Sequence, residues 1–212
     1  MILLLVFLLF ISTAHGDAAL NNLMEKLQNK YQNLGTLKAN FTQSYASKRF
    51  SDRIVEEGVV YLRKGGYMKW EYQKPERKIF ISDGRYFIYY VPEDKQAIKA
   101  SLDRSDVHSP ALFLAGRGNF LTDFRAEWAD PRPGSNLVKL IPIRPQLDFQ
   151  YLNAQVDPAS GLILRLVVVD SYENRTEYSF QQIKENLSIP QDFFHFRPPP
   201  GTDVIMQDRE GN

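Results

Sequence analysis

The chain has 212 residues, no cysteine, and 26 basic residues against 25 acidic ones, which leaves a formal net charge of +1. This balance argues against a nucleic-acid partner, because proteins that bind phosphate backbones usually carry a basic excess on one face. Without cysteine the chain forms neither disulfides nor thiolate metal sites, so its hydrophobic core alone must stabilise it.

Residues 1–16 have the pattern of a signal peptide. Met1 to Ile11 are apolar almost without interruption, and the small residues of 12–16 follow before Asp17. A membrane-spanning helix needs about 20 apolar residues, and this run is little more than half of that. We therefore expect cleavage after Gly16 and export of residues 17–212 as one soluble domain, which has no cysteine for a lipid anchor.

The mature chain begins with a predicted amphipathic helix. Asp17 is a suitable N-cap, and Gly35 follows the last apolar position of the pattern. The apolar residues recur at the i, i+3, i+4, i+7 spacing of one helix face; they are Leu20, Leu23, Met24, Leu27, Tyr31 and Leu34.

From Leu37 the apolar period changes from 3.6 to 2, which indicates strands. Gly, Pro, Asn and Asp separate the segments at short intervals, so neighbouring strands are expected to form antiparallel hairpins. About eleven strands are predicted: Leu37–Tyr45, Ile54–Arg63, Tyr67–Tyr72, Lys78–Asp83, Tyr86–Val91, Gln96–Ser101, Phe124–Ala129, Leu137–Ile143, Asp148–Val156, Ile163–Asp170 and Arg175–Ile183.

One apolar segment, Pro110–Gly116, interrupts the strands. Ser109 can cap a helix there, Pro110 suits its first position, and Gly116 ends it. Two helices beside a long antiparallel sheet predict the α+β class, mainly β, in a single domain.

The sequence lacks the residues of common catalytic and metal sites. His108 and His195 are the only histidines of the mature chain, and no Gly-x-Ser-x-Gly or His-Glu-x-x-His motif occurs. Gly116-Arg117-Gly118 lacks the third glycine of a phosphate loop. We expect no metal, no cofactor and no enzymatic activity.

Several segments, taken together and in order, resemble the LolA family of periplasmic lipoprotein carriers. Each is short and common by itself, but the set covers nearly the whole mature chain. The segments are Leu37–Gln43, Gly58, Met68–Tyr72 with Pro75, Ile81–Gly84, Tyr86–Tyr90, Pro110–Gly116, Asp170, Thr176–Phe180 and Phe194–Ile205.

The resemblance implies an incomplete antiparallel β-barrel of about eleven strands, with helices that form a lid over an apolar cavity. It also implies a monomeric, non-catalytic periplasmic carrier. Its partners would be acylated lipoproteins, an inner-membrane ATP-driven exporter that supplies them, and an outer-membrane acceptor lipoprotein that receives them.

Candidate binding residues follow from this resemblance. The lid would carry Leu112, Phe113 and Leu114. The family commonly has Arg-Pro before the strand that leads to the Trp, with the Arg bonded to lid carbonyls; here Lys64 takes that position, with Arg63 as the alternative latch, although lysine lacks the guanidinium fork. The expected cavity wall comprises Phe41, Val60, Leu62, Met68, Trp70, Phe80, Phe87 and Tyr89.

Three other functions remain open. The same scaffold could carry a glycolipid or another non-protein lipid. It could act as an enzyme on a small aromatic substrate, in which case a polar cavity with convergent ionisable groups is expected. It could also bind exposed strands of outer-membrane proteins through an open sheet edge.

Overall fold

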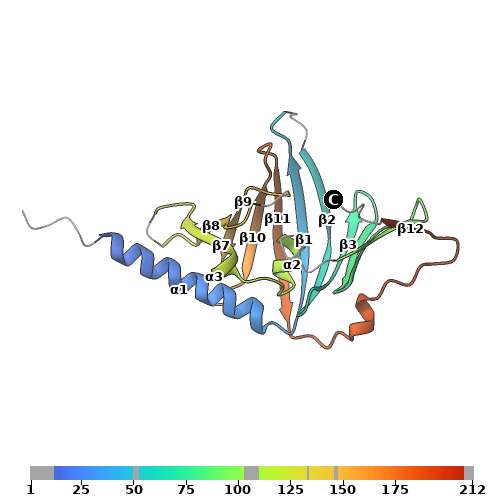
Figure 1. Ribbon diagram of the computed structural model, residues 1–212, viewed down its shortest axis with the longest axis horizontal. Helices are drawn as coiled ribbons and strands as arrows, with labels where there is room; N and C mark the ends of the chain where they lie inside the picture. Colours follow the sequence, from blue (N-terminus) through green and yellow to red (C-terminus); the bar gives the residue numbers. More distant parts are fainter. Residues whose placement is uncertain (1–11, 50–52, 103–109, 133, 146–147, 208–212) are drawn as a thin grey trace, which may run out of the picture.

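The computed structural model describes residues 12–49, 53–102, 110–132, 134–145 and 148–207. Twelve strands of these residues form one sheet in the order β12-β6-β5-β4-β3-β2-β1-β11-β10-β9-β8-β7 (Figure 1). β7 and β12 are free edges, so the sheet is not closed, as the prediction of an incomplete barrel requires. All strand pairs are antiparallel except β12 with β6.

The eleven predicted strands are confirmed, and three of them have the predicted bounds. Most others shift by one to three residues at an end, where pairing with the neighbouring strand rather than the sequence pattern sets the limit. The strands are β1 (Thr36–Ala46), β2 (Arg53–Arg63), β3 (Tyr67–Lys74), β4 (Lys78–Asp83), β5 (Tyr86–Val91), β6 (Gln96–Ser101), β7 (Phe124–Trp128), β8 (Leu137–Pro142), β9 (Tyr151–Val156), β10 (Ile163–Val169), β11 (Arg175–Glu185) and the unpredicted β12 (Asp203–Gln207).

Helix α1 (Ser12–Asn33) is longer than predicted. The expected start at Asp17 was wrong, since the helix begins at Ser12, although residues 12–16 include only one alanine and one glycine and have no strong helix propensity. All six apolar residues of the predicted stripe are buried, which confirms its face. Residues 1–11 of the predicted signal peptide lie outside the described residues, and the predicted cleavage site lies within α1.

Two short helices follow β6 in the chain. The predicted helix is confirmed as α2 (Pro110–Leu114), and α3 (Phe120–Asp123) was not predicted. Asn119 caps α3, because its side chain accepts hydrogen bonds from the backbone N–H groups of Leu121 and Thr122. Gln28 of α1 also holds this turn, because its side-chain oxygen Oε1 accepts a hydrogen bond from the Phe120 N–H at 2.7 Å.

Helices α1, α2 and α3 pack on one face of the sheet, which we call the inner face (Figure 1). Their apolar side chains share one core cluster with inward residues of the strands, among them Phe41, Val60 and Trp70. α1 and α3 contact each other and β7. The helices therefore cover one part of the inner face rather than its full width.

The C-terminal segment covers the opposite, outer face. After β11 the chain forms the 3-10 helix η2 (Gln191–Phe194), which contacts β3 and β4, and then pairs β12 with β6. Phe193 packs on Tyr61 and Phe194 packs on Tyr67. Because the residues next to these tyrosines in the strands face inward, the tyrosines themselves face outward. A second apolar cluster lies on this face; its buried members are Ile81, Ile88, Tyr90 and Ala97.

Candidate functional site

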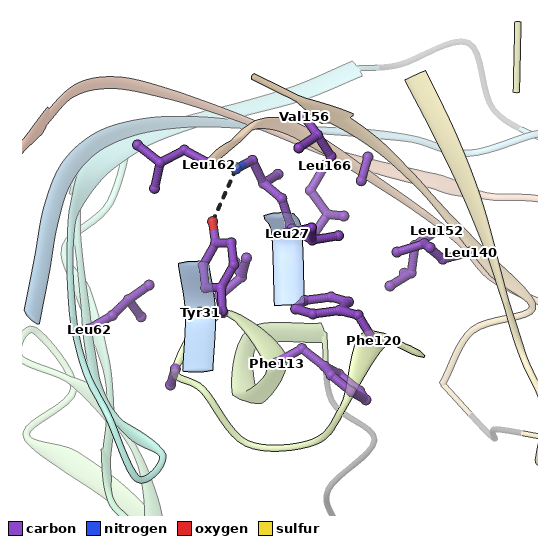
Figure 2. Close-up of a cluster of buried hydrophobic side chains, with 14 of the residues drawn as sticks. Leu27, Tyr31, Leu62, Phe113, Phe120, Leu140, Leu152, Val156, Leu162 and Leu166 are labelled. Carbon is purple, nitrogen blue, oxygen red and sulfur yellow. Dashed lines mark hydrogen bonds between the residues drawn. The ribbon is translucent and has the colours of Figure 1, made fainter. Parts of the chain in front are cut away.

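The helix-covered part of the inner face is filled with large apolar side chains (Figure 2). The Tyr31 ring of α1 contacts the Phe120 ring edge-on at 5.8 Å, and Leu27 of the same helix lies nearby. Phe113 of α2 packs between Phe120 and Phe124 at ring distances of 5.4 and 4.9 Å. The Tyr31 hydroxyl accepts the Ile163 N–H at 3.2 Å, drawn as a dashed line. Burial raises the pKa of Tyr31 far above its ordinary value. The helices are thus bound to the sheet mainly by apolar contact.

Beside the helices, aromatic side chains continue across the inner face as a band that we call the aromatic strip. Each ring contacts at least one other ring of the strip, at centroid distances between 4.6 and 6.5 Å. The part of the strip farthest from β1 is only half-buried, so apolar surface is open there. The strip consists of Phe41, Trp70, Tyr72, Phe80, Phe87, Tyr89, Tyr178 and Phe180.

The structure brings most predicted wall residues together on this face. Phe41, Val60, Leu62, Met68 and Trp70 are buried members of the core cluster, each 5% exposed or less. The remaining three are less buried; Phe80 and Phe87 pack against that cluster, and Tyr89 stacks on Phe80 at 4.6 Å. Their role in binding acyl chains remains a prediction.

Sequence reasoning missed Tyr178 and Phe180 of β11. Both belong to the strip because β11 pairs with β1, so that Phe180 lies opposite Phe41 and Tyr178 opposite Gln43. The alternation within Thr176–Phe180 carried the signal for an inward face, but the pairing of β11 with β1 joins segments far apart in the chain. Only the sheet topology puts them beside the predicted wall.

Polar groups border one side of the strip, across β1 to β4. Tyr72 donates through its hydroxyl to Gln43 Oε1 at 2.6 Å, and Gln43 Nε2 donates to Glu56 Oε2 at 3.0 Å. Lys78 completes this polar network with an ion pair to Glu56 at 2.5 Å. Burial raises the pKa of Tyr72 far above its ordinary value and raises the pKa of Tyr178 to about 12.

The predicted lid residues all lie within the core. Leu112, Phe113 and Leu114 are 1%, 2% and 3% exposed, while the predicted helix cap, Ser109, lies outside the described residues. Three successive residues of a helix can be buried together here because α2 lies between α1, α3 and the sheet, so that several of its sides are covered. Any opening of α2 would therefore expose these three apolar side chains to water.

The turn between β2 and β3 contacts the C-terminal end of α2, near the predicted latch. Arg63 points away from the lid and donates to the Ile189 carbonyl at 2.8 Å. Lys64 is exposed beside Gly116 and lines a surface hollow with Gly35, Thr36, Arg63, Asn186 and Leu187. A backbone hydrogen bond joins this turn to the lid, from the Gly66 N–H to the Ala115 carbonyl at 3.1 Å.

An arginine does lie at this contact, on the lid side. Arg117 packs directly over Gly66, where an added Cβ atom would lie 2.6 Å from its Cδ. Its Nη1 atom is buried and has no hydrogen-bond partner among the described residues. The family resemblance implies a basic side chain on the turn that bonds to carbonyls of the lid. Here the basic side chain, Arg117, follows the predicted lid helix, and the turn donates a backbone N–H group instead. Whether Lys64 or Arg63 takes part in a latch remains a prediction.

Two further features bear on other functions. No group of three or more His, Cys, Asp or Glu side chains within the described residues is arranged to hold a metal ion. None of the helices in that part of the chain combines the length and apolar character needed to cross a membrane.

Comparison with known proteins places this architecture in a family. The model of the outer membrane lipoprotein carrier protein LolA matches residues 32–197. The outer-membrane lipoprotein carrier protein of Nitrosomonas europaea is 27% identical over 170 residues, 80% of this chain and 82% of that protein. The protein of the same name from Nitrosospira multiformis is 28% identical over 207 residues, 96% of this chain and 95% of that one.

A solved structure supports the fold independently. The crystal structure of an uncharacterized conserved protein from Thermus thermophilus superposes with a TM-score of 0.54 at 15% identity, over 88% of this chain and 98% of that one. Since the family model matches most of the chain, and the sheet's inner face lies within the matched region, the chain belongs to the family of the outer membrane lipoprotein carrier protein LolA.

Proposed function

We propose that this protein is a periplasmic carrier that binds the acyl chains of lipoproteins on the inner face of its sheet. It would receive them from an inner-membrane ATP-driven exporter and deliver them to an outer-membrane acceptor. It would work as a monomer, without a cofactor and without catalysis. Its family membership and the names of its relatives support this proposal.

Physical chemistry explains why such a carrier is needed. Three acyl chains carry about 40 methylenes, and at about 0.8 kcal/mol each their exposure to water would cost on the order of 30 kcal/mol. A lipoprotein therefore does not cross an aqueous compartment unaided. The carrier must cover this surface and must also release it, which favours a mobile cover over a rigid complementary pocket.

The observation that carries the proposal is the continuity of apolar surface from the helix-covered core to the half-buried aromatic strip. Acyl chains laid on the strip would extend the core cluster without any change in the sheet. The polar network of Tyr72, Gln43, Glu56 and Lys78 lies along one side of this surface, so it does not interrupt it.

Full loading requires the helices to move. Phe113, Phe120 and Tyr31 occupy the inner face in this structure, and acyl chains would displace them. We propose α2 as the lid, with Gly116 and Gly118 beside it at φ values of 71° and 92°, which side-chain-bearing residues rarely adopt. Each apolar group that leaves the core would be replaced by an acyl chain, so loading exchanges one apolar contact for another.

Export completes the proposal. Cleavage after Gly16 would leave α1 to begin at Asp17, whose carboxylate is favourable at the positive end of a helix dipole. N-terminal sequencing of the protein recovered from the periplasm tests this step. Recovery of the uncleaved chain with membranes would contradict it.

Native mass spectrometry of the periplasmic protein tests the function itself. We expect a population whose added mass equals that of a triacylated peptide or lipoprotein, and whose cargo is lost when an acceptor membrane is added. A bound glycolipid would favour a carrier of non-protein lipid. Binding of outer-membrane protein segments that added lipid does not displace would favour a chaperone for exposed strands.

A further inference from the structure

The indole of Trp70 lies in the middle of the aromatic strip with its one polar atom unpaired. The residue is 5% exposed, and its Nε1 atom is buried without a hydrogen-bond partner among the described residues. A buried tryptophan usually pairs this N–H group, and an unsatisfied buried donor costs about 1–3 kcal/mol. The position therefore retains a donor that no other described residue of the protein uses.

The surroundings of the indole offer apolar surface. Its ring contacts are with Phe41 at 5.0 Å, Tyr178 at 5.5 Å and Phe180 at 6.1 Å. Across the sheet Trp70 lies between Val60 and Phe80. Indole nitrogen is a donor only, so any partner must bring an acceptor oxygen into an otherwise apolar site.

An acyl chain brings such an acceptor. Its hydrocarbon part suits the strip, and its only polar group is the ester or amide linkage at one end, whose carbonyl oxygen accepts hydrogen bonds. Free water would satisfy the indole equally well, but water needs two to four polar partners and finds few among these rings.

The polarity of the inner face gives the direction of such a chain. One inward position beyond Trp70 on β3 is Tyr72, about 7 Å away along the strand, and there the polar network begins. In the opposite direction the inward residues Met68, Leu62 and Leu37 are apolar and lead toward the helices. If the acyl linkage lies at Trp70, the hydrocarbon chain would lie over Met68, Leu62 and Leu37, and the polar end of the cargo would lie over the polar network.

We infer that the Trp70 Nε1–H group donates a hydrogen bond to an ester or amide carbonyl of the bound acyl cargo, whose polar end lies over Gln43, Tyr72, Glu56 and Lys78. This assignment rests on the proposed function and adds to it a position for the acyl linkage and an orientation for the chains. Trp70 would then bind the hydrocarbon through its ring and the ester or amide linkage through its N–H group.

The test pairs a change in the protein with a change in the lipid. The probes are a fluorescent peptide with an S-diacylglyceryl cysteine, whose two chains are ester-linked, and its dialkyl ether analogue with the same chain length and no acyl carbonyl. The protein variant carries benzothienylalanine at position 70, which keeps the shape of the indole and replaces N–H by sulfur. Trp128→Phe, in β7 outside the strip, is the matched control for loss of a tryptophan.

We expect the wild type and Trp128→Phe to bind the ester probe about three- to tenfold more tightly than the ether probe, as one additional hydrogen bond predicts. The position-70 variant should bind both probes equally. A ¹³C-labelled ester carbonyl should also absorb at lower infrared frequency when bound to the wild type than when bound to the variant, because only the wild type offers it the indole N–H.

The outcomes separate the two proposals. An ester preference that persists in the position-70 variant, or wild-type binding of both probes without preference, would overturn the assignment of Trp70 and leave the carrier function intact. Failure of the wild type to bind either probe would overturn the carrier function and the assignment with it. Trp70→Phe, measured in parallel, shows whether loss of the N–H group has the same effect in a smaller ring.

Discussion

Gly58 of β2 lies close to the backbone of β3 and to an aromatic ring of β1. An added Cβ atom would lie 2.1 Å from the Glu71 carbonyl oxygen and 2.8 Å from Phe41 Cε1. The first contact is with backbone, which cannot rotate away as a side chain can. The glycine is therefore required by space rather than by its backbone angles, since its φ is not positive.

We expect Gly58→Ala to lower the free energy of unfolding by about 3 kcal/mol, at the upper end of the usual cost of overpacking. The matched control is Gly201→Ala, where φ is 79° and no atom lies within 4 Å, so that only backbone strain is added, of about 1–2 kcal/mol. Urea unfolding followed by tryptophan fluorescence measures both. Equal unfolding midpoints for the two variants would show that β3 moves to admit the methyl group.

Three of the 11 tyrosines should ionise late in the folded protein. Burial raises the pKa of Tyr31, Tyr72 and Tyr178, and that of Tyr178 to about 12, from an ordinary value of 10.0. The unfolded chain then releases these protons at lower pH than the folded chain does. Their contribution to stability is complete below about pH 10 and is lost as the pH rises toward about 12 and beyond.

Phenolate absorbance during an alkaline titration, with urea unfolding at each pH, tests this expectation. In the native protein the phenolate absorbance of Tyr31, Tyr72 and Tyr178 should appear only late in the titration, together with unfolding. In urea all of them should titrate near the ordinary value. A single native transition near about pH 10 would mean that the three hydroxyls are accessible to solvent.

At the scale of elements, the turn between β2 and β3 is joined to the end of α2 by a backbone hydrogen bond, which the proposed movement of α2 would break. Gly66 donates its N–H to the Ala115 carbonyl, one of the terminal carbonyls that a helix cannot satisfy by itself. Gly66→Ala would press a methyl group against Arg117 at a φ of 87°. Gly65→Ala adds similar backbone strain at a φ of 97° and meets only Tyr67, at 3.5 Å.

We expect Gly66→Ala to increase hydrogen exchange of α2 about tenfold or more over Gly65→Ala, a difference of about 1.4 kcal/mol in local opening. Lys64→Leu should change the exchange modestly, by no more than about 1–2 kcal/mol, because its ammonium is exposed to solvent. Should Lys64→Leu open α2 more than Gly66→Ala does, the lysine would be the latch that the family resemblance suggests.

The sequence predicted elements well where alternation was long and the neighbouring strand was close in the chain. β4, β5 and β6 have the predicted bounds because short turns fix their hairpins. It failed for α3, whose four residues are too few for helical periodicity, and for β12, in which Val204, Ile205 and Met206 do not alternate and all five residues are exposed. β12 forms only through its parallel pairing with β6, a strand about a hundred residues earlier in the chain.

At the scale of the whole molecule, the two faces of the sheet are covered by different segments of the chain: α1, α2 and α3 on the inner face and the C-terminal segment on the outer face. On the outer face of β5, Ile88 and Tyr90 are buried. The sequence did not predict that residues 190–207 cover this face. They contain no long periodic element, and they contact the sheet mainly through Phe193, Phe194 and Phe196. The assignment of Trp70 and the other wall residues to the inner face likewise depends on where both covers lie.

The outer cover gives a prediction that separates stability from binding. Phe194 is 0% exposed, and its ring lies 6.0 Å from Tyr67 and 5.4 Å from Phe193. We expect Phe194→Ala to lower the free energy of unfolding by about 3–5 kcal/mol, a large part of the roughly 5–15 kcal/mol typical of a domain. Phe193→Ala, at a half-buried position under the Lys69 ammonium, should cost less.

Neither variant should change binding of an acylated probe in conditions where the protein stays folded, because both rings lie on the face opposite to the aromatic strip. Urea unfolding and titration with the fluorescent diacylglyceryl peptide, made on the same preparations, give the two quantities. Weakened binding by folded Phe194→Ala would mean that the outer cover transmits its packing through β3 and β4 to Trp70 and Phe80, which belong to the same two strands. Unchanged binding with reduced stability would establish that the C-terminal segment supports the sheet and leaves the inner face free for cargo.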